Sequence, residues 1–205
     1  SIDLYLKQQK RVKGGDRYIE FIQNTLDLEP SECNFEDYDF KIFDKIQDMV
    51  QAIKEKDVEY GLCRIVAGYA WNWKTKDGKS DYDIEIDGLK MVWNSTNSDW
   101  VNSKNAINEV GCIHTVQGYD LNYAWVIIGP EVSYNPDTHQ IIIHKDKYQD
   151  FNGKRSVSNE DELKFYILNI YKTLLTRAIY GTYIYVADEN LRNYLKVAAH
   201  DLNFT

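Results

Sequence analysis

The sequence predicts an α/β domain in which helices cover both faces of a mostly parallel β-sheet, with one β-hairpin inserted. Segments whose apolar residues recur at helical spacing alternate with short apolar runs along most of the chain. Such alternation is typical of strand–helix–strand units with right-handed crossovers. The run Ala124-Trp125-Val126-Ile127-Ile128 is apolar at every position, which is typical of a strand that is covered on both faces.

The amino-terminal part is expected to contain two helices. Asp16 is a candidate N-cap for a helix over about 17–28, which the break at Glu29-Pro30-Ser31 ends. Apolar residues then recur at helical spacing over about 37–56, so a second helix is predicted there.

A strand and a hairpin are expected next. The segment 61–70 is apolar enough for a buried strand. Strict alternation over about 81–93, around Asp87-Gly88, predicts the inserted β-hairpin, because this dipeptide favours a tight two-residue turn. Residues 94–108 are rich in Asn and Ser and are expected to form a loop.

The remainder alternates again between strands and helices. The sequence predicts strands at 111–115 and 123–128, an excursion at about 130–158, a helix at 160–178, a strand at 182–187 and a helix at 189–199. Neither an internal repeat nor a low-complexity linker is present, so residues 1–205 are expected to form a single domain.

The composition restricts the classes of partner. The net charge of −8 argues against a protein that wraps duplex DNA by neutralising phosphates. Any nucleic-acid contact is therefore expected to be local, or to be shared with a more basic partner domain that is absent from this chain. The three cysteines, Cys33, Cys63 and Cys112, form no paired motif, which favours a reducing cytoplasm over a disulfide framework or a zinc site. The sequence contains neither a signal peptide nor an apolar run of about 18 residues, and no membrane partner is expected.

The segment Ile113-His114-Thr115-Val116-Gln117-Gly118-Tyr119-Asp120 precedes the apolar strand directly. It resembles motif V of superfamily 1 helicases, although Asp120 stands where glutamate is commoner. Its glycine lets the backbone approach a ligand, and a helix N-terminus beside it would offer N–H groups to phosphate. The resemblance implies nucleotide binding by Gln117, Gly118 and Asp120, with Asp120 on the ribose, and nucleic-acid contact by His114 and Thr115.

A second segment, Tyr171-Lys172-Thr173-Leu174-Leu175-Thr176-Arg177-Ala178, is similar to motif VI of the same superfamily. There a Thr-Arg-Ala triplet ends a helix before a core strand. The resemblance implies that Arg177 reaches the γ-phosphate of ATP and that Thr176 belongs to the nucleotide site. Arginine fingers contribute on the order of 10³–10⁵ in rate, which corresponds to about 4–7 kcal/mol. An exposed salt bridge contributes only about 0–1 kcal/mol.

A third segment, Leu6-Lys7-Gln8-Gln9-Lys10-Arg11, is similar to motif IV, which donates another phosphate-contacting arginine, here Arg11. Further likeness points to a bacterial family with a Schlafen-like helicase domain of unknown function. It lies in Arg11-Val12-Lys13-Gly14-Gly15, Ala67-Gly68-Tyr69-Ala70-Trp71, Trp93-Asn94 and Asn108-Glu109-Val110-Gly111-Cys112.

The three motifs stand in the order IV, V, VI over about residues 6–188. This order implies the second, carboxy-terminal lobe of a UvrD-like superfamily 1 DNA/RNA helicase. That lobe has a three-layer RecA-like fold of the P-loop NTPase type.

The sequence lacks a P-loop of its own. Gly78-Lys79-Ser80 has Trp73 where the first glycine of a P-loop is required, and no strand precedes it. We therefore expect a first lobe of the same polypeptide, absent from this chain, to hold most of the ATP and the Mg²⁺. This chain alone is expected to turn over no ATP and to bind no cofactor or metal.

Single-stranded DNA or RNA is the second expected partner. Trp71, Trp93 and Asn94 are the candidates for strand contact outside motif V, since aromatic rings stack on bases. Core packing is the alternative for each tryptophan, as it is for Tyr69, Trp73 and Trp100.

Two other functions remain open. The chain could be a non-catalytic binding module that retains the fold. It could also be a metal-dependent nuclease that uses the alternating Asp81, Asp83, Glu85 and Asp87. Alternation would place these four carboxylates on one strand face, where they would more simply form the solvated edge of a hairpin.

Overall fold

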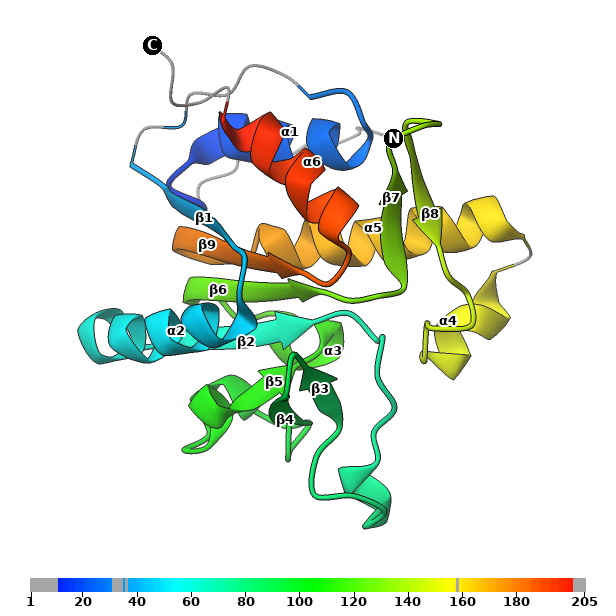
Figure 1. The fold of residues 1–205 in the computed structure, drawn as a ribbon. Coiled ribbons are helices and arrows are strands. Elements are labelled where there is room, and N and C mark those ends of the chain that lie inside the picture. The colour runs from blue at the N-terminus through cyan, green and yellow to red at the C-terminus, as the bar shows by residue number, and fades with distance from the viewer. Residues whose placement is uncertain (1–10, 31–34, 36, 158, 201–205) are drawn as a thin grey trace, which may run out of the picture.

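The computed structural model describes residues 11–30, 35, 37–157 and 159–200. Its centre is a seven-stranded sheet with the order β1-β9-β6-β2-β5-β4-β3, seen nearly edge-on in Figure 1. Every neighbouring pair is parallel except β3 and β4. The strands are β1 (Asp39–Phe43), β2 (Cys63–Ala67), β3 (Ile84–Ile86), β4 (Leu89–Trp93), β5 (Glu109–Gly111), β6 (Leu121–Ile128) and β9 (Ala178–Val186).

Helices cover both faces of this sheet, so the predicted α/β class with three layers is confirmed and is compatible with a RecA-like fold. The helices are α1 (Gly15–Leu26), α2 (Ile46–Tyr60), α3 (Ile113–Val116), α4 (Phe151–Ser156), α5 (Glu160–Leu175) and α6 (Glu189–His200). Helix α2 packs on one face through Ile46, Met49 and Ile53, which are fully buried. Helices α1, α5 and α6 cover the other face, against alternate residues of β6 such as Ala124 and Val126.

The predicted helix at 37–56 is wrong at its start. Residues 39–43 form the edge strand β1, which pairs with β9 from Asp39–Gly181 to Phe43–Tyr185, and α2 begins only at Ile46. Phe40 and Phe43 fit a helical spacing that continues into α2. The backbone of this segment instead finds its hydrogen-bond partners on β9, so the sheet determines the conformation.

Other boundaries also differ from the sequence prediction; for example, the strand expected at 182–187 is β9, which begins at Ala178. Asp16 is not an N-cap, because α1 begins at Gly15 and Asp16 lies within its first turn. Residues 113–115 belong to helix α3 rather than to a strand, and β5 has already ended at Gly111. Helix α5 ends at Leu175, before Thr176 and Arg177.

The predicted hairpin is confirmed as β3 and β4. Asp87 and Gly88 both have positive φ angles, 49° and 78°, as a tight hairpin turn of the mirror-image class requires. Strand β4 pairs in parallel with β5, so the hairpin extends one edge of the main sheet. The excursion after β6 forms a separate antiparallel pair, β7 (Val132–Asn135) and β8 (Gln140–Ile143).

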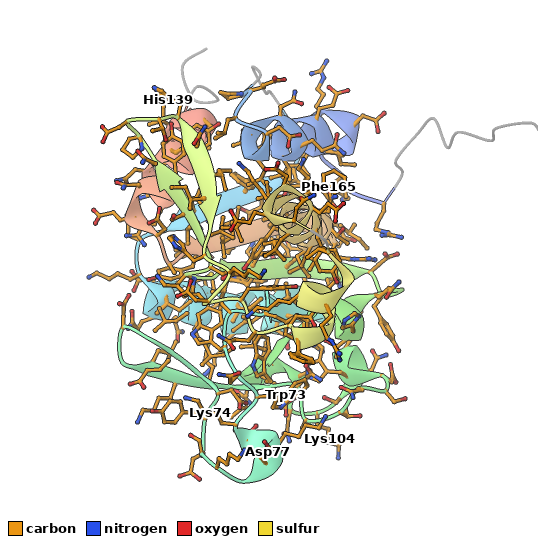
Figure 2. All side chains as sticks on the ribbon, turned by 90° about the vertical axis from the view of Figure 1, so that its right-hand side faces the viewer. Trp73, Lys74, Asp77, Lys104, His139 and Phe165 are labelled. Carbon is orange, nitrogen blue, oxygen red and sulfur yellow. The ribbon has the colours of Figure 1, made fainter. Side chains whose placement is uncertain are left out.

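The loop between β2 and β3 projects beyond the hairpin edge of the sheet. It contains the short 3-10 helix η1 (Thr75–Asp77), and Trp73, Lys74 and Asp77 lie at the lower end of the molecule in Figure 2. Asp83 fastens this loop to the hairpin, since its carboxylate accepts hydrogen bonds from Thr75 N, Thr75 Oγ1 and Trp93 N at 2.8 Å each.

Two further expectations concern thiols and membranes. Cys63 and Cys112 are buried and carry free thiols, while Cys33 lies outside the described residues. Within the ranges given above, the helices are too short or too polar to cross a membrane.

Candidate functional site

Two of the predicted motifs meet because their strands are neighbours. Asp120 directly precedes β6, and Arg177 directly precedes β9. The two strands are parallel and start in register, with Leu121 opposite Ala178, and Leu121 N donates to Arg177 O at 3.3 Å. Residues that lie 57 positions apart (177 − 120) in the sequence are therefore held at the same edge of the sheet.

Arg11 reaches the same edge from the amino-terminal segment. Val12 is buried in the core, and Lys13 N donates to Ile179 O at 2.9 Å, so the backbone beside Arg11 is fixed against the start of β9. Arg11 Nε lies 2.5 Å from Asp120 Oδ1, and their side chains are 39% and 50% exposed. The rest of the motif IV segment, Leu6 to Lys10, lies outside the described residues.

Arg177 is half-buried, and its Nε atom is buried without a hydrogen-bond partner among the described residues. Burial lowers the pKa of its guanidinium, the positive charge of Arg11 lowers this pKa further, and Asp120 raises it. Two guanidinium groups therefore act on one another beside the carboxylate of Asp120. The unused Nε donor of Arg177, next to a second guanidinium, suits an anion.

A pocket of about 270 Å³ joins motif V to motif VI. His114 and Gln117 contribute from α3 and its carboxyl end, and Arg177 contributes from the segment before β9. Helix α5 supplies the opposite wall. The other lining residues are Ile113, Tyr166, Asn169, Ile170 and Thr173.

Sequence reasoning did not select the α5 wall of this pocket. Tyr166, Asn169, Thr173 and Arg177 are spaced by three or four residues, so a helix carries the first three on one face and leads to the arginine. That spacing of polar residues was the available signal, but motif VI was matched only from Tyr171 onward.

Three predicted residues have local structural roles. Thr115 Oγ1 accepts from Cys112 N at 3.0 Å and donates to Cys112 O at 2.9 Å, so it caps α3. Thr176 Oγ1 donates to Lys172 O at 2.9 Å and thus satisfies a carbonyl at the end of α5. Gly118 has a φ of +87° and open space around it, so glycine is required there by the backbone conformation.

The expected helix N-terminus beside Gly118 is wrong. Gly118 follows the end of α3, and the next element along the chain is the strand β6. Backbone N–H groups of a helix start are therefore not aimed at a ligand there, and the anion-binding capacity of this edge rests on the two arginines.

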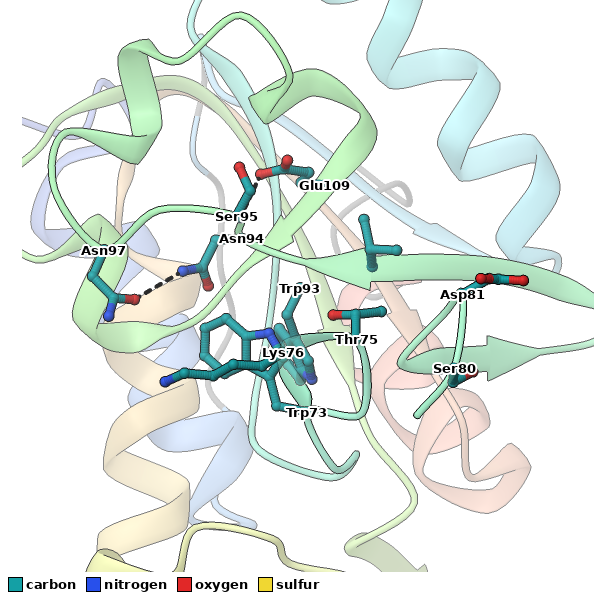
Figure 3. Close-up of a pocket in the computed structure, with 11 residues that line it drawn as sticks. Trp73, Thr75, Lys76, Ser80, Asp81, Trp93, Asn94, Ser95, Asn97 and Glu109 are labelled. Atoms are coloured by element: carbon teal, nitrogen blue, oxygen red, sulfur yellow. Dashed lines mark hydrogen bonds between the residues drawn. The ribbon is translucent and has the colours of Figure 1, made fainter. Parts of the chain in front are cut away.

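Of the predicted strand contacts, Trp93 and Asn94 line a second pocket, of about 460 Å³, shown in Figure 3, whereas Trp71 does not line it. Trp93 and Asn94 are each only 1% exposed, and Trp93 Nε1 donates to the carbonyl oxygen of the half-buried Trp71 at 3.3 Å. The ring of Trp93 is thus largely covered by its own domain. Trp73 and Lys76, which line the same pocket, lie closer to solvent.

Aromatic rings connect the two pockets. The ring centroids of His114 and Tyr69 are 6.0 Å apart, those of Tyr69 and Trp93 are 5.9 Å apart, and those of Trp93 and Trp73 are 6.2 Å apart. Trp93 is buried, so this run of rings links the two pockets through the interior of the domain.

The four hairpin carboxylates do not share one solvated face. Asp83 is 2% exposed and is engaged by the three hydrogen bonds described above, and Asp87 Oδ2 accepts from Tyr185 Oη at 3.0 Å. Over the part of the chain that the structure describes, His, Cys, Asp and Glu side chains form no group of three that could hold a metal ion. The prediction, from their alternation in the sequence, that these four acids share one strand face is therefore wrong.

Comparison with known proteins adds a family and a relative. The model of the Schlafen group 3 DNA/RNA helicase domain matches residues 1–188. An uncharacterized protein of Saccharomyces cerevisiae is 34% identical over 214 aligned residues, which cover 93% of this chain and 47% of that protein. The chain therefore spans about half the length of this curated relative. No solved structure matches the chain.

Proposed function

The chain belongs to the Schlafen group 3 DNA/RNA helicase domain family, and we propose that it acts as the second RecA-like lobe of a superfamily 1, UvrD-like motor. In this proposal another lobe of the same polypeptide carries the P-loop and the acidic residues that bind Mg²⁺. Hydrolysis of ATP there would supply the free energy for movement along single-stranded DNA or RNA. The observation that carries the proposal is the convergence of Arg11, Asp120 and Arg177 at one edge of the sheet.

Arg177 is proposed to stabilise charge that develops on the γ-phosphate. Its half-buried position restricts the side chain, and its Nε donor is unused among the described residues. Arginine keeps its charge in proteins, and its planar fork fits phosphate oxygens. Gln117 lines the same pocket and is proposed to contact the nucleotide beside it.

Arg11 is proposed as the second phosphate contact, although it is paired with Asp120. Both partners of this ion pair are substantially exposed, and such pairs contribute only about 0–1 kcal/mol. A triphosphate can therefore take Arg11 from Asp120 at little cost. Asp120 would then be released to accept a hydrogen bond from a ribose hydroxyl.

His114 is proposed to contact the nucleic-acid strand. It is exposed and lines the same pocket as Arg177. A contact with the nucleic-acid strand and a contact with the nucleotide phosphate would thus share one pocket. In the proposed motor, a change at the nucleotide would therefore act directly on a residue that contacts the nucleic acid.

The test is the nucleic-acid-stimulated ATPase rate of a polypeptide that contains this domain together with its P-loop lobe. Replacement of Arg177 by Ala is expected to lower kcat by about 10³-fold or more, the usual effect of removing an arginine finger. Arg177→Lys is expected to recover only part of the rate, because lysine lacks the planar fork.

Arg155→Ala is the matched control, since Arg155 is an exposed arginine on α4 that contacts Phe151. It should leave the rate unchanged. A rate for Arg177→Ala within about threefold of the unsubstituted protein would refute the finger role, because an arginine finger contributes far more than that.

A further inference from the structure

We propose that the pocket between Trp73 and Asn94 binds one unstacked nucleobase of a single strand and prefers bases that carry an amino group. This inference rests on the proposed contact with single-stranded nucleic acid and adds a specific subsite to it. The pocket lies between the β2–β3 loop and the strand β4, as Figure 3 shows.

Asn94 presents a buried acceptor. Its Nδ2 donates to Thr96 O at 3.0 Å and to Asn97 Oδ1 at 3.2 Å. Because a backbone carbonyl can only accept, the contact with Thr96 fixes which end of the amide is the nitrogen. The other end, Oδ1, has no hydrogen-bond partner among the described residues. Solvent reaches it poorly, because Asn94 is only 1% exposed.

An unsatisfied buried acceptor destabilises a protein unless a ligand or water supplies a donor. The exocyclic amino group of cytosine, adenine or guanine is such a donor. Thymine and uracil offer only their ring N3–H, which lies between two carbonyl oxygens that would repel Asn94 Oδ1. Asn94 Nδ2 cannot compensate by donating to one of these oxygens, because it is already engaged with Thr96 and Asn97. The oxygen of Asn94 therefore favours amino-bearing bases.

Trp73 supplies a surface on which a base can stack. One side of its indole lies against Trp93, with centroids 6.2 Å apart, and Lys76 Nζ lies 5.3 Å from its ring centroid. Trp73 is half-buried and Lys76 is exposed. A base that stacks on Trp73 would take the place of the Lys76 ammonium over the ring, and the exposed Lys76 side chain would then contact the phosphate of that nucleotide.

The charges next to Asn94 favour a base over a cationic peptide side chain, since Asp81, the exposed carboxylate of the pocket, lies at the end away from Asn94 in Figure 3. Lys76 already occupies the cation position over Trp73 and would repel a second cation. Glu109 lines the pocket, but its Oε2 already accepts from Trp100 Nε1 at 2.7 Å and from Ser95 N at 2.9 Å. Asn94 is thus left as the neutral acceptor for an uncharged donor.

The test uses this chain and fluorescently labelled oligo(dC) and oligo(dT) of equal length, with binding measured by anisotropy. Oligo(dC) is expected to bind about tenfold more tightly, as for one base-specific hydrogen bond. Trp73→Ala is expected to weaken oligo(dC) binding by roughly five- to hundredfold, and Trp73→Phe by less, because a ring remains.

Asn94→Ala is expected to remove the preference for oligo(dC) over oligo(dT). Circular dichroism must show that this variant is folded, because Asn94 is buried. If Asn94→Ala is not folded, the comparison of Trp73→Ala with Trp73→Phe tests the pocket instead, because Trp73 is only half-buried. Phe165→Ala is the control, because Phe165 is a 71% exposed aromatic residue on α5 and should leave binding unchanged.

Equal binding of oligo(dC) and oligo(dT), or full oligo(dC) affinity in Trp73→Ala, would overturn the proposal. If an arginine-rich peptide binds more tightly than oligo(dC), and Trp73→Ala abolishes that binding, the pocket belongs to a protein partner and the proposal is overturned as well. The motor proposal is tested separately, by the ATPase rate of Arg177→Ala. If oligo(dC) is preferred but Arg177→Ala leaves the ATPase rate unchanged, the motor proposal alone is refuted. If Arg177→Ala lowers the ATPase rate as expected but oligo(dC) is not preferred, the base-pocket proposal alone is refuted.

Discussion

At the scale of single residues, Glu131 is the most unusual side chain outside the proposed sites. It is fully buried just beyond the end of β6, where Tyr171 Oη donates to its Oε1, and Oε2 has no partner among the described residues. A Cβ added to Gly68 or Gly129 would lie within 3 Å of a Glu131 carboxylate oxygen. These glycines therefore give room to the carboxyl group. Burial raises the pKa of Glu131 to about 7, against a lowering by the Tyr171 hydrogen bond.

This shift predicts a fall in stability as pH rises. The ordinary pKa is 4.5 and the folded value is about 7, so between these values the folded state holds a proton that the unfolded state has released. The stabilisation is full below the unfolded pKa and is lost as pH rises through the folded one. The loss should reach about 3 kcal/mol, at about 1.4 kcal/mol for each pKa unit. Urea unfolding of the unsubstituted chain and of Glu131→Gln across this range measures it.

Glu131→Gln should flatten the decline, because glutamine does not titrate. Glu85→Gln, at an exposed position of β3, should leave the decline unchanged. Identical slopes for the unsubstituted chain and Glu131→Gln would show that Glu131 does not titrate in this range.

Residue positions were predictable where a motif lies directly before a strand. Arg177 and Asp120 each precede a strand directly, so their proximity follows once β6 and β9 are neighbours. The hydroxyl contacts of Thr115 and Thr176 were not predictable, because each depends on the residue at which a helix begins or ends. Errors of one or two residues at a helix end are enough to change such a contact.

At the scale of elements, strand β1 shows why the amino-terminal part was partly mispredicted. Its five residues gain their pairing from β9, about 140 positions later in the sequence. No local pattern contains that information. The hairpin at β3 and β4 was predictable because its turn, Asp87-Gly88, lies within the segment itself.

The β1–β9 pairing predicts that Gly181 cannot be replaced by alanine without loss of stability. A Cβ there would lie 2.4 Å from Asp39 O and 2.5 Å from Tyr123 Cε1. Because the first contact is backbone, relief requires β1 to move, and we expect a cost of about 2–3 kcal/mol or more in the free energy of unfolding. Urea denaturation measures this cost.

Gly78→Ala is the comparison, because Gly78 has a φ of +64° and open space around it. That substitution strains only its own backbone, by about 1 kcal/mol. If Gly181→Ala costs no more than Gly78→Ala, the close approach of β1 to β9 is wrong.

At the scale of the whole molecule, layers and strand direction were predictable and strand order was not. Alternating helix and strand patterns indicate a parallel sheet with helices on both faces. The order β1-β9-β6-β2-β5-β4-β3 depends on packing between distant segments. The proximity of the Trp73 pocket to the His114 pocket follows from that order and was absent from the motif comparison.

The net charge of −8 predicts a shallow salt dependence for single-strand binding. Binding that neutralises about two phosphates should give a slope of log K against log salt near −1.4. Affinity for oligo(dC) should therefore fall by less than about tenfold between roughly 50 and 200 mM salt. A titration series in NaCl with anisotropy as the readout measures this slope. A fall in oligo(dC) affinity of about 10³-fold or more over this range would indicate that an extended basic surface, and not a local contact, binds the nucleic acid.

The hydrogen bond from Leu121 N to Arg177 O has a mechanical consequence. It ties the two strand starts together, and the pocket that contains Arg177 also contains His114. Under the proposed function, a rotation of this domain towards a bound nucleotide would move His114, the proposed nucleic-acid contact, through the same angle as Arg177. Translocation would then require no hinge within the domain, because the domain would rotate as a rigid body.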